Sequence, residues 1–139
     1  MRVGVVEKRK NRKQGRRTSI STSTRKMSEM VWEFAGEFIR LGETLGEKQN
    51  FLNAVCSAWN IACNTPEVRD RSLDHYVESY RSYNSDASDE EISGIRSTME
   101  KLMQNKLCLF PAVQKQIVSA QITQMAGKDR IDVASASFE

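Results

Sequence analysis

The chain has 139 residues, enough for about one domain, and 39% of them are hydrophobic, so only a modest core can form. The formal net charge of +3 hides a division, because residues 1–26 carry ten Lys/Arg and one acid, a net of +9, whereas residues 27–139 carry a net of −6. This asymmetry is typical of a basic tail on an acidic domain and argues against a basic face on the folded part. We find no apolar run near the roughly 18–20 residues of a membrane span, and no apolar segment of a secretory signal in the first 26 residues.

The three cysteines, Cys56, Cys63 and Cys108, are odd in number and irregular in spacing, so they predict no disulfide framework. Each has apolar neighbours in sequence, where a free cysteine behaves as a small hydrophobic residue. This usage favours a reducing, cytoplasmic compartment.

Residues 1–26 are predicted to form a disordered basic arm, since they hold too little apolar surface to offset the entropy of ordering. Basic clusters of this kind can bind phosphate backbones or serve as a nuclear address, and an organellar presequence is a less favoured alternative. The candidate nucleic-acid-binding residues are Lys8, Arg9, Lys10, Arg12, Lys13, Arg16 and Arg17.

From Ser28 onward the chain is predicted to form a single helical domain over residues 27–139. Apolar residues recur at heptad spacing from residue 31 to residue 62, which predicts one long helix over residues 28–63, roughly 54 Å in length. Gly42 and Gly46 flank a weak stretch of the pattern, and a break near Gly46 is the alternative. We favour a continuous helix because the register survives the gap and no capping residue directly follows Gly46.

Two further helices have clear start signals. Thr65 followed by Pro66 predicts a helix over residues 66–83. Ser88 and Glu91 form a capping box, which predicts a helix over residues 89–109 that stops before Pro111.

After Pro111 the apolar period changes from that of a helix to that of a strand. The alternation predicts a β-hairpin over residues 116–137, turning near Ala126 and Gly127. A phase slip in the second strand predicts a bulge near Ala134. A helix that runs from Ala112 into the first strand is the competing interpretation.

Residues that could carry chemistry are few and scattered. His75, the single histidine, is predicted to lie on the solvent face of its helix. Cys56 and Cys63 lie two turns apart, about 10 Å, so they cannot share a metal ion within one helix. These residues form no recognisable catalytic, metal or cofactor motif, and none is predicted.

The sequence therefore predicts a mainly α protein with an antiparallel helical core, one long heptad-patterned helix and a C-terminal β-hairpin. A 36-residue apolar stripe is longer than its neighbouring helices can cover, which predicts contact with another chain. We expect a non-enzymatic adaptor or assembly subunit, a homodimer or the partner of a helical protein, with an interface that includes Val31, Phe34, Phe38 and Leu41. A nucleic-acid-binding accessory protein that uses the basic arm is the alternative.

Overall fold

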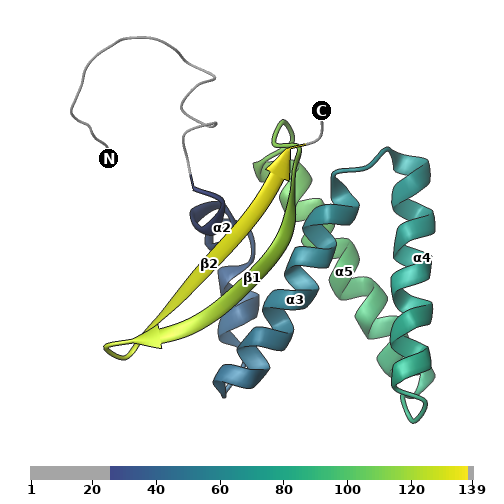
Figure 1. Cartoon of the computed structure of the whole chain (residues 1–139). Helices are drawn as coiled ribbons and strands as arrows, with labels where there is room; N and C mark the ends of the chain where they lie inside the picture. The colour runs from purple at the N-terminus through teal and green to yellow at the C-terminus, as the bar shows by residue number, and fades with distance from the viewer. Residues whose placement is uncertain (1–25, 138–139) are drawn as a thin grey trace.

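The computed structural model describes residues 26–137, so the predicted disordered arm lies outside the described residues except for Lys26. Within these residues, four helices are followed by one antiparallel hairpin. Figure 1 shows their arrangement. Their bounds are α2 (Met27–Arg40), α3 (Leu45–Ala62), α4 (Pro66–Tyr83), α5 (Asp89–Leu109), β1 (Lys115–Met125) and β2 (Lys128–Ser137). The predicted mainly α fold with a C-terminal hairpin is confirmed.

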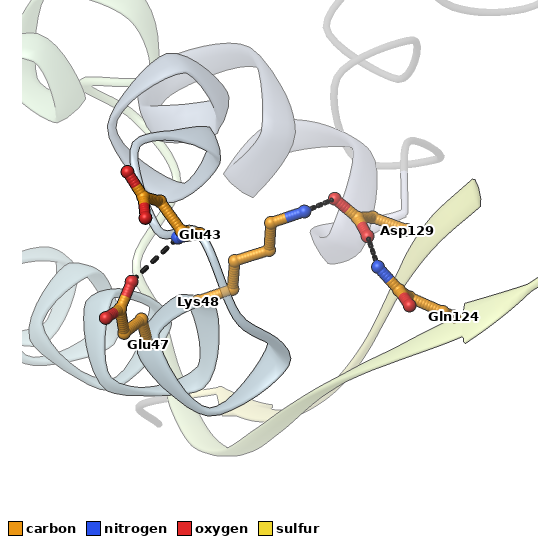
Figure 2. Close-up of polar contacts among 5 residues, drawn as sticks. All are labelled: Glu43, Glu47, Lys48, Gln124 and Asp129. Atoms are coloured by element: carbon orange, nitrogen blue, oxygen red, sulfur yellow. Dashed lines mark hydrogen bonds and ion pairs between the residues drawn. The ribbon is translucent and has the colours of Figure 1, made fainter. Parts of the chain in front are cut away.

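The prediction of one long helix over residues 28–63 is wrong, because the chain leaves the helix after Arg40 and starts α3 at Leu45. Thr44 caps α3 by accepting the Glu47 N–H at 3.1 Å. The Glu47 carboxylate in turn accepts the N–H of Glu43 at 2.7 Å (Figure 2). A β-carbon on Gly42 would lie 2.8 Å from the backbone nitrogen of Lys48, so the connection depends on glycine at this position.

The break lets α2 pack back against α3, and their aromatic residues form much of the contact. Phe34 meets Trp59 edge to face with ring centroids 5.3 Å apart, and Phe38 lies 4.9 Å from Phe51. Trp59 is completely buried and also approaches Phe110. Most of the apolar stripe that predicted an external partner therefore packs against other residues of the same chain.

The next two helices have the predicted bounds. α4 begins with Pro66 after Thr65. The Ser88 side chain accepts the Glu91 N–H at 3.1 Å while the Glu91 carboxylate accepts the Ser88 N–H at 3.2 Å, so the predicted capping box is present. At α5, capping satisfies main-chain groups that a helix end leaves unpaired. At α4, Thr65 makes no capping bond, and Pro66 marks the start because its fixed φ suits the first helical position.

The predicted hairpin is also present, with two residues in its turn. Ala126 and Gly127 both have positive φ, 54° and 78°, as the type I′ turns that join twisted strands require. The predicted bulge near Ala134 lies instead on the opposite strand, where the register shifts between Ile117 and Ser119. Because the extra residue is in β1, side chains on either side of it can face the helices although their spacing is odd.

The hairpin lies across α2 and α3, whereas α4 lies on the far side of the helical layer (Figure 1). Ile117, Ile122 and Ile131 are the buried side chains of the hairpin and join the helical core. The inner face of the sheet is thus covered by the protein's own helices.

Candidate protein-interaction edge

The outer edge of β1 is covered by side chains of α3 that replace a neighbouring strand. The Asn60 amide accepts the Ile117 N–H at 2.7 Å and donates to the Ile117 carbonyl at 2.9 Å. The Gln49 amide accepts the Ile122 N–H at 2.9 Å and donates to the Ala120 carbonyl at 3.1 Å. The main chain of this strand therefore has partners on both sides, from β2 and from α3.

The outer edge of β2 has a different environment. In an antiparallel ladder, opposite residues alternate between pairs that bond each other and pairs whose main-chain groups point away. Ile131 lies opposite Ile122 and Val133 lies opposite Ala120, the two β1 residues that bind Gln49. The N–H and C=O groups of Ile131 and Val133 consequently point away from β1, and within residues 26–137 they have no hydrogen-bond partner.

A groove of about 690 Å³ runs beside this edge, between β2 and the first turns of α2. Trp32 is half-buried on its α2 side, and Ile131 is buried on its β2 side. The groove is lined by Lys26, Met27, Ser28, Glu29, Trp32, Lys115, Asp129, Arg130, Ile131, Asp132, Val133 and Ser135. Its lining combines apolar surface with both signs of charge, so it can accept an amphipathic strand.

Charged side chains lie on the outer face of β2, away from the helices. Arg130 Nε and Asp132 Oδ1 are 3.3 Å apart, and both side chains are more than half exposed. An exposed ion pair of this kind contributes little to stability, so its partners can be exchanged at small cost. The edge therefore offers main-chain hydrogen bonds with a rim of unlike charges.

The tip of the hairpin is fixed to the helices by one ion pair (Figure 2). Lys48 Nζ lies 2.7 Å from Asp129 Oδ2, and Gln124 donates to Asp129 Oδ1 at 3.1 Å. These two hydrogen bonds hold the pKa of the Asp129 carboxyl below its usual range. Asp129 thereby anchors β2 near its turn, and Ser137 at the other end of β2 pairs with Lys115 of β1.

The predicted interface residues are placed in different surroundings. Val31 is completely buried and Phe34 is 3% exposed, so neither is accessible to a partner in this structure. Phe38 is partly buried against Phe51, and only Leu41, at 69%, is well exposed. The heptad pattern identified residues that pack inside the chain, because the break at Gly42 turns α2 onto α3.

A second groove, of about 790 Å³, lies between α2 and α5 and includes Phe38, Leu41 and Leu109 in its lining. It is the part of the predicted interface that stays accessible. The candidate nucleic-acid-binding residues Lys8, Arg9, Lys10, Arg12, Lys13, Arg16 and Arg17 lie outside the described residues.

Lys106 is completely buried, which the sequence analysis did not anticipate. Its ammonium donates to the Val113 carbonyl at 2.7 Å and lies 5.1 Å from the centroid of the Trp59 ring. Burial lowers the pKa of Lys106, and it raises the pKa of the nearby Cys63 thiol. The ammonium ties the end of α5 to the start of the hairpin, so we assign it a structural role.

Other reactive side chains stay apart. His75 is exposed on α4, at a groove between α3 and α4. Within residues 26–137, no three His, Cys, Asp or Glu side chains converge as metal ligands would. The three cysteines are free thiols.

Sequence reasoning missed Gln49 and Asn60, although both bind the main chain at the outer edge of β1. They lie 11 positions apart, or about three helical turns, and so share a face of α3. That spacing is a signal only when it is known that a strand passes beside this helix, 57 to 73 residues farther along the chain.

No protein-family model, curated protein or solved structure matches this chain. Among the helices of residues 26–137, none combines the length and the apolar character that crossing a membrane requires.

Proposed function

We propose that this protein is a non-enzymatic assembly or adaptor subunit, and that it binds by adding an extended strand to the edge of β2. The observation that carries the proposal is the asymmetry of the hairpin. Side chains of α3 bind the main chain along β1. In contrast, the main-chain N–H and C=O groups of Ile131 and Val133 point into a groove. In strand addition, main-chain hydrogen bonds supply affinity and alternate side chains supply specificity.

Physical chemistry supports an occupant for this edge. Unpaired strand edges are templates for pairing with other chains, and natural proteins usually cover or disrupt them. Here α3 covers one edge. A two-stranded hairpin gains stability from additional strands. We propose a cytoplasmic location, since free thiols suit a reducing compartment.

The test uses a labelled peptide that copies residues 127–137 as the extended strand, titrated into the full chain and followed by fluorescence anisotropy. We expect saturable binding that Val133→Pro in the full chain abolishes, because proline removes the outward N–H. Val133→Thr retains that N–H and similar shape, and it should bind as the native chain does. Absence of binding to the native chain, or equal binding to the proline variant, would refute strand addition.

The charge division of the sequence supports a second candidate, a nucleic-acid-binding accessory protein. Ten of the 21 Lys/Arg lie in residues 1–26. Binding through these residues should weaken steeply with salt, because counterions are released from the phosphates. Replacing the seven residues Lys8, Arg9, Lys10, Arg12, Lys13, Arg16 and Arg17 by Gln should then abolish the mobility shift of a generic DNA or RNA duplex, and an unchanged shift would exclude this candidate.

A further inference from the structure

We infer that the strand added to β2 is β2 of a second copy, paired antiparallel about a two-fold axis at Ile131. The inference rests on the strand addition proposed above and names its partner. In this register Ile131 lies opposite Ile131 of the second copy, and Arg130 lies opposite Asp132 of the second copy.

The direction of the main-chain groups restricts the possible registers. A residue on the two-fold axis faces itself, and it can exchange two hydrogen bonds only if its N–H and C=O point away from β1. Asp129, Ile131, Val133 and Ser135 meet this condition as alternate residues of β2. Gln49 binds the residues opposite Ile131 and Val133, and Asn60 binds the residue opposite Ser135. Symmetric registers centred on any of these residues, or on Arg130 or Asp132 between them, therefore have the correct hydrogen-bond geometry, because outward-pointing residues face one another in each.

The charges of β2 distinguish among these registers. Centring on Arg130 or on Asp132 places that residue opposite its own copy, so like charges meet at the axis. Centring on Ser135 forms no ion pair between the copies. Centring on Asp129 places Lys128 opposite Arg130, and like charges directly opposite each other are destabilising. Centring on Val133 places Arg130 opposite Ala136 and Asp132 opposite Ala134, without any ion pair. Centring on Ile131 forms two ion pairs between Arg130 and Asp132, one on each side of the axis, on the exposed outer face.

The surroundings of Ile131 favour the same register. Its side chain is buried against the helices, so a second Ile131 beside it would extend the inner apolar layer over the groove. The Asp129 carboxylate at the end of the shared segment stays bound to Lys48 of its own chain. The product is a closed dimer with a four-stranded sheet whose two outer edges are both covered by α3, so assembly stops at two copies.

Two single charge reversals test this register without relying on the ion pair within one chain. Arg130→Asp makes both positions acidic and Asp132→Arg makes both basic, so each variant alone opposes like charges across the axis. We expect each to weaken the dimer by about tenfold or more, as measured by sedimentation equilibrium. An equimolar mixture should form the heterodimer at native affinity, and native mass spectrometry distinguishes the two chains by mass.

Disulfide trapping provides a second measurement of the register, in a Cys108→Ser background that removes the exposed native thiol. Arg130 and Asp132 of the second copy form a pair that is not hydrogen-bonded, with Cα atoms about 4.5 Å apart, within disulfide range. A mixture of Arg130→Cys and Asp132→Cys chains should therefore cross-link. Arg130→Cys alone should not, since its copies lie diagonally, about 7–8 Å apart.

The outcomes separate this inference from the proposed function. If the full chain stays monomeric at about 100 µM while the peptide of residues 127–137 binds, strand addition stands and the second copy is the wrong partner. If the peptide binds only when residues 1–25 are digested away, the edge is occupied by the chain's own N-terminal segment and the inference fails. If the charge variants dimerise as the native chain does, or the cysteines cross-link only as like pairs, the Ile131 register is wrong.

Discussion

The side-chain amide of Asn60 binds both main-chain groups of Ile117, accepting its N–H at 2.7 Å and donating to its carbonyl at 2.9 Å. A carboxamide presents one acceptor and one donor side by side, much as the peptide groups of a neighbouring strand do. One helix side chain therefore takes the place of a third strand, and Gln49 repeats the arrangement farther along β1.

Replacing Asn60 by Ala should destabilise the protein markedly. The change leaves the N–H and C=O of Ile117 without partners at a buried residue, and each such loss costs about 1–3 kcal/mol. We expect the free energy of unfolding in urea to fall by about 2–4 kcal/mol. Gln104→Ala, which removes an exposed amide of α5, should change it by no more than about 0.5 kcal/mol. Equal effects of the two substitutions would mean that Asn60 does not stabilise the β1 edge.

Two glycine substitutions should have opposite effects. A β-carbon at Gly42 would lie 2.8 Å from the Lys48 backbone nitrogen, so Gly42→Ala must displace the start of α3 and should lower the melting temperature. Gly94 lies within α5 and has no atom within 4 Å of the added carbon, so Gly94→Ala should stabilise the protein by about 1 kcal/mol. Thermal unfolding measured by circular dichroism compares the two directly, and stabilisation by Gly42→Ala would contradict the tight connection.

The ion pair between Lys48 and Asp129 should make stability depend on acid pH. Hydrogen bonds from Lys48 and then Gln124 lower the pKa of Asp129 in the folded state, so the unfolded state binds the proton more readily. The stabilisation is therefore present above the ordinary value of 3.8 and is lost as the pH falls through the lowered pKa. Asp129→Asn should reduce the slope of melting temperature against pH below about pH 4, whereas Glu100→Gln, an exposed carboxylate of α5, should preserve it.

Lys106 should tolerate replacement by Met better than replacement by Ala. Met retains most of the buried volume and removes a charge whose burial is costly, so Lys106→Met should be nearly neutral or stabilising at pH 7. Lys106→Ala leaves a cavity and should cost about 2–5 kcal/mol.

The pH dependence of the same variants checks the cause. Burial lowers the Lys106 pKa in the folded state, so the unfolded state binds more protons, and this residue makes native stability rise between the lowered pKa and the ordinary value of 10.5. The advantage of Lys106→Met over the native chain should accordingly shrink as the pH is raised through that window in urea titrations. An advantage that is constant with pH would show that the buried charge is not its source.

The connection between α2 and α3 contains a capping signal that the sequence analysis did not use. Thr44 and Glu47 have the three-residue spacing of a capping box, and Thr44 does cap α3. The heptad register across Gly42 and Gly46 favoured a continuous helix instead. The register persisted because α2 and α3 each present an apolar face to the same core, which produces the same pattern as one continuous helix.

The sequence by itself determined the elements whose ends are set by local hydrogen bonds or by the backbone preferences of single residues. These include the start of α4 at Pro66, the capping box of α5 at Ser88 and the hairpin turn at Ala126 and Gly127, since each depends on residues within a few positions of one another. Only the tertiary structure decided that Val31 is buried while Leu41 is exposed. It alone also decided which hairpin edge is covered, because Gln49 binds main-chain groups 71 and 73 residues away and no local pattern encodes which strand will pass beside a helix.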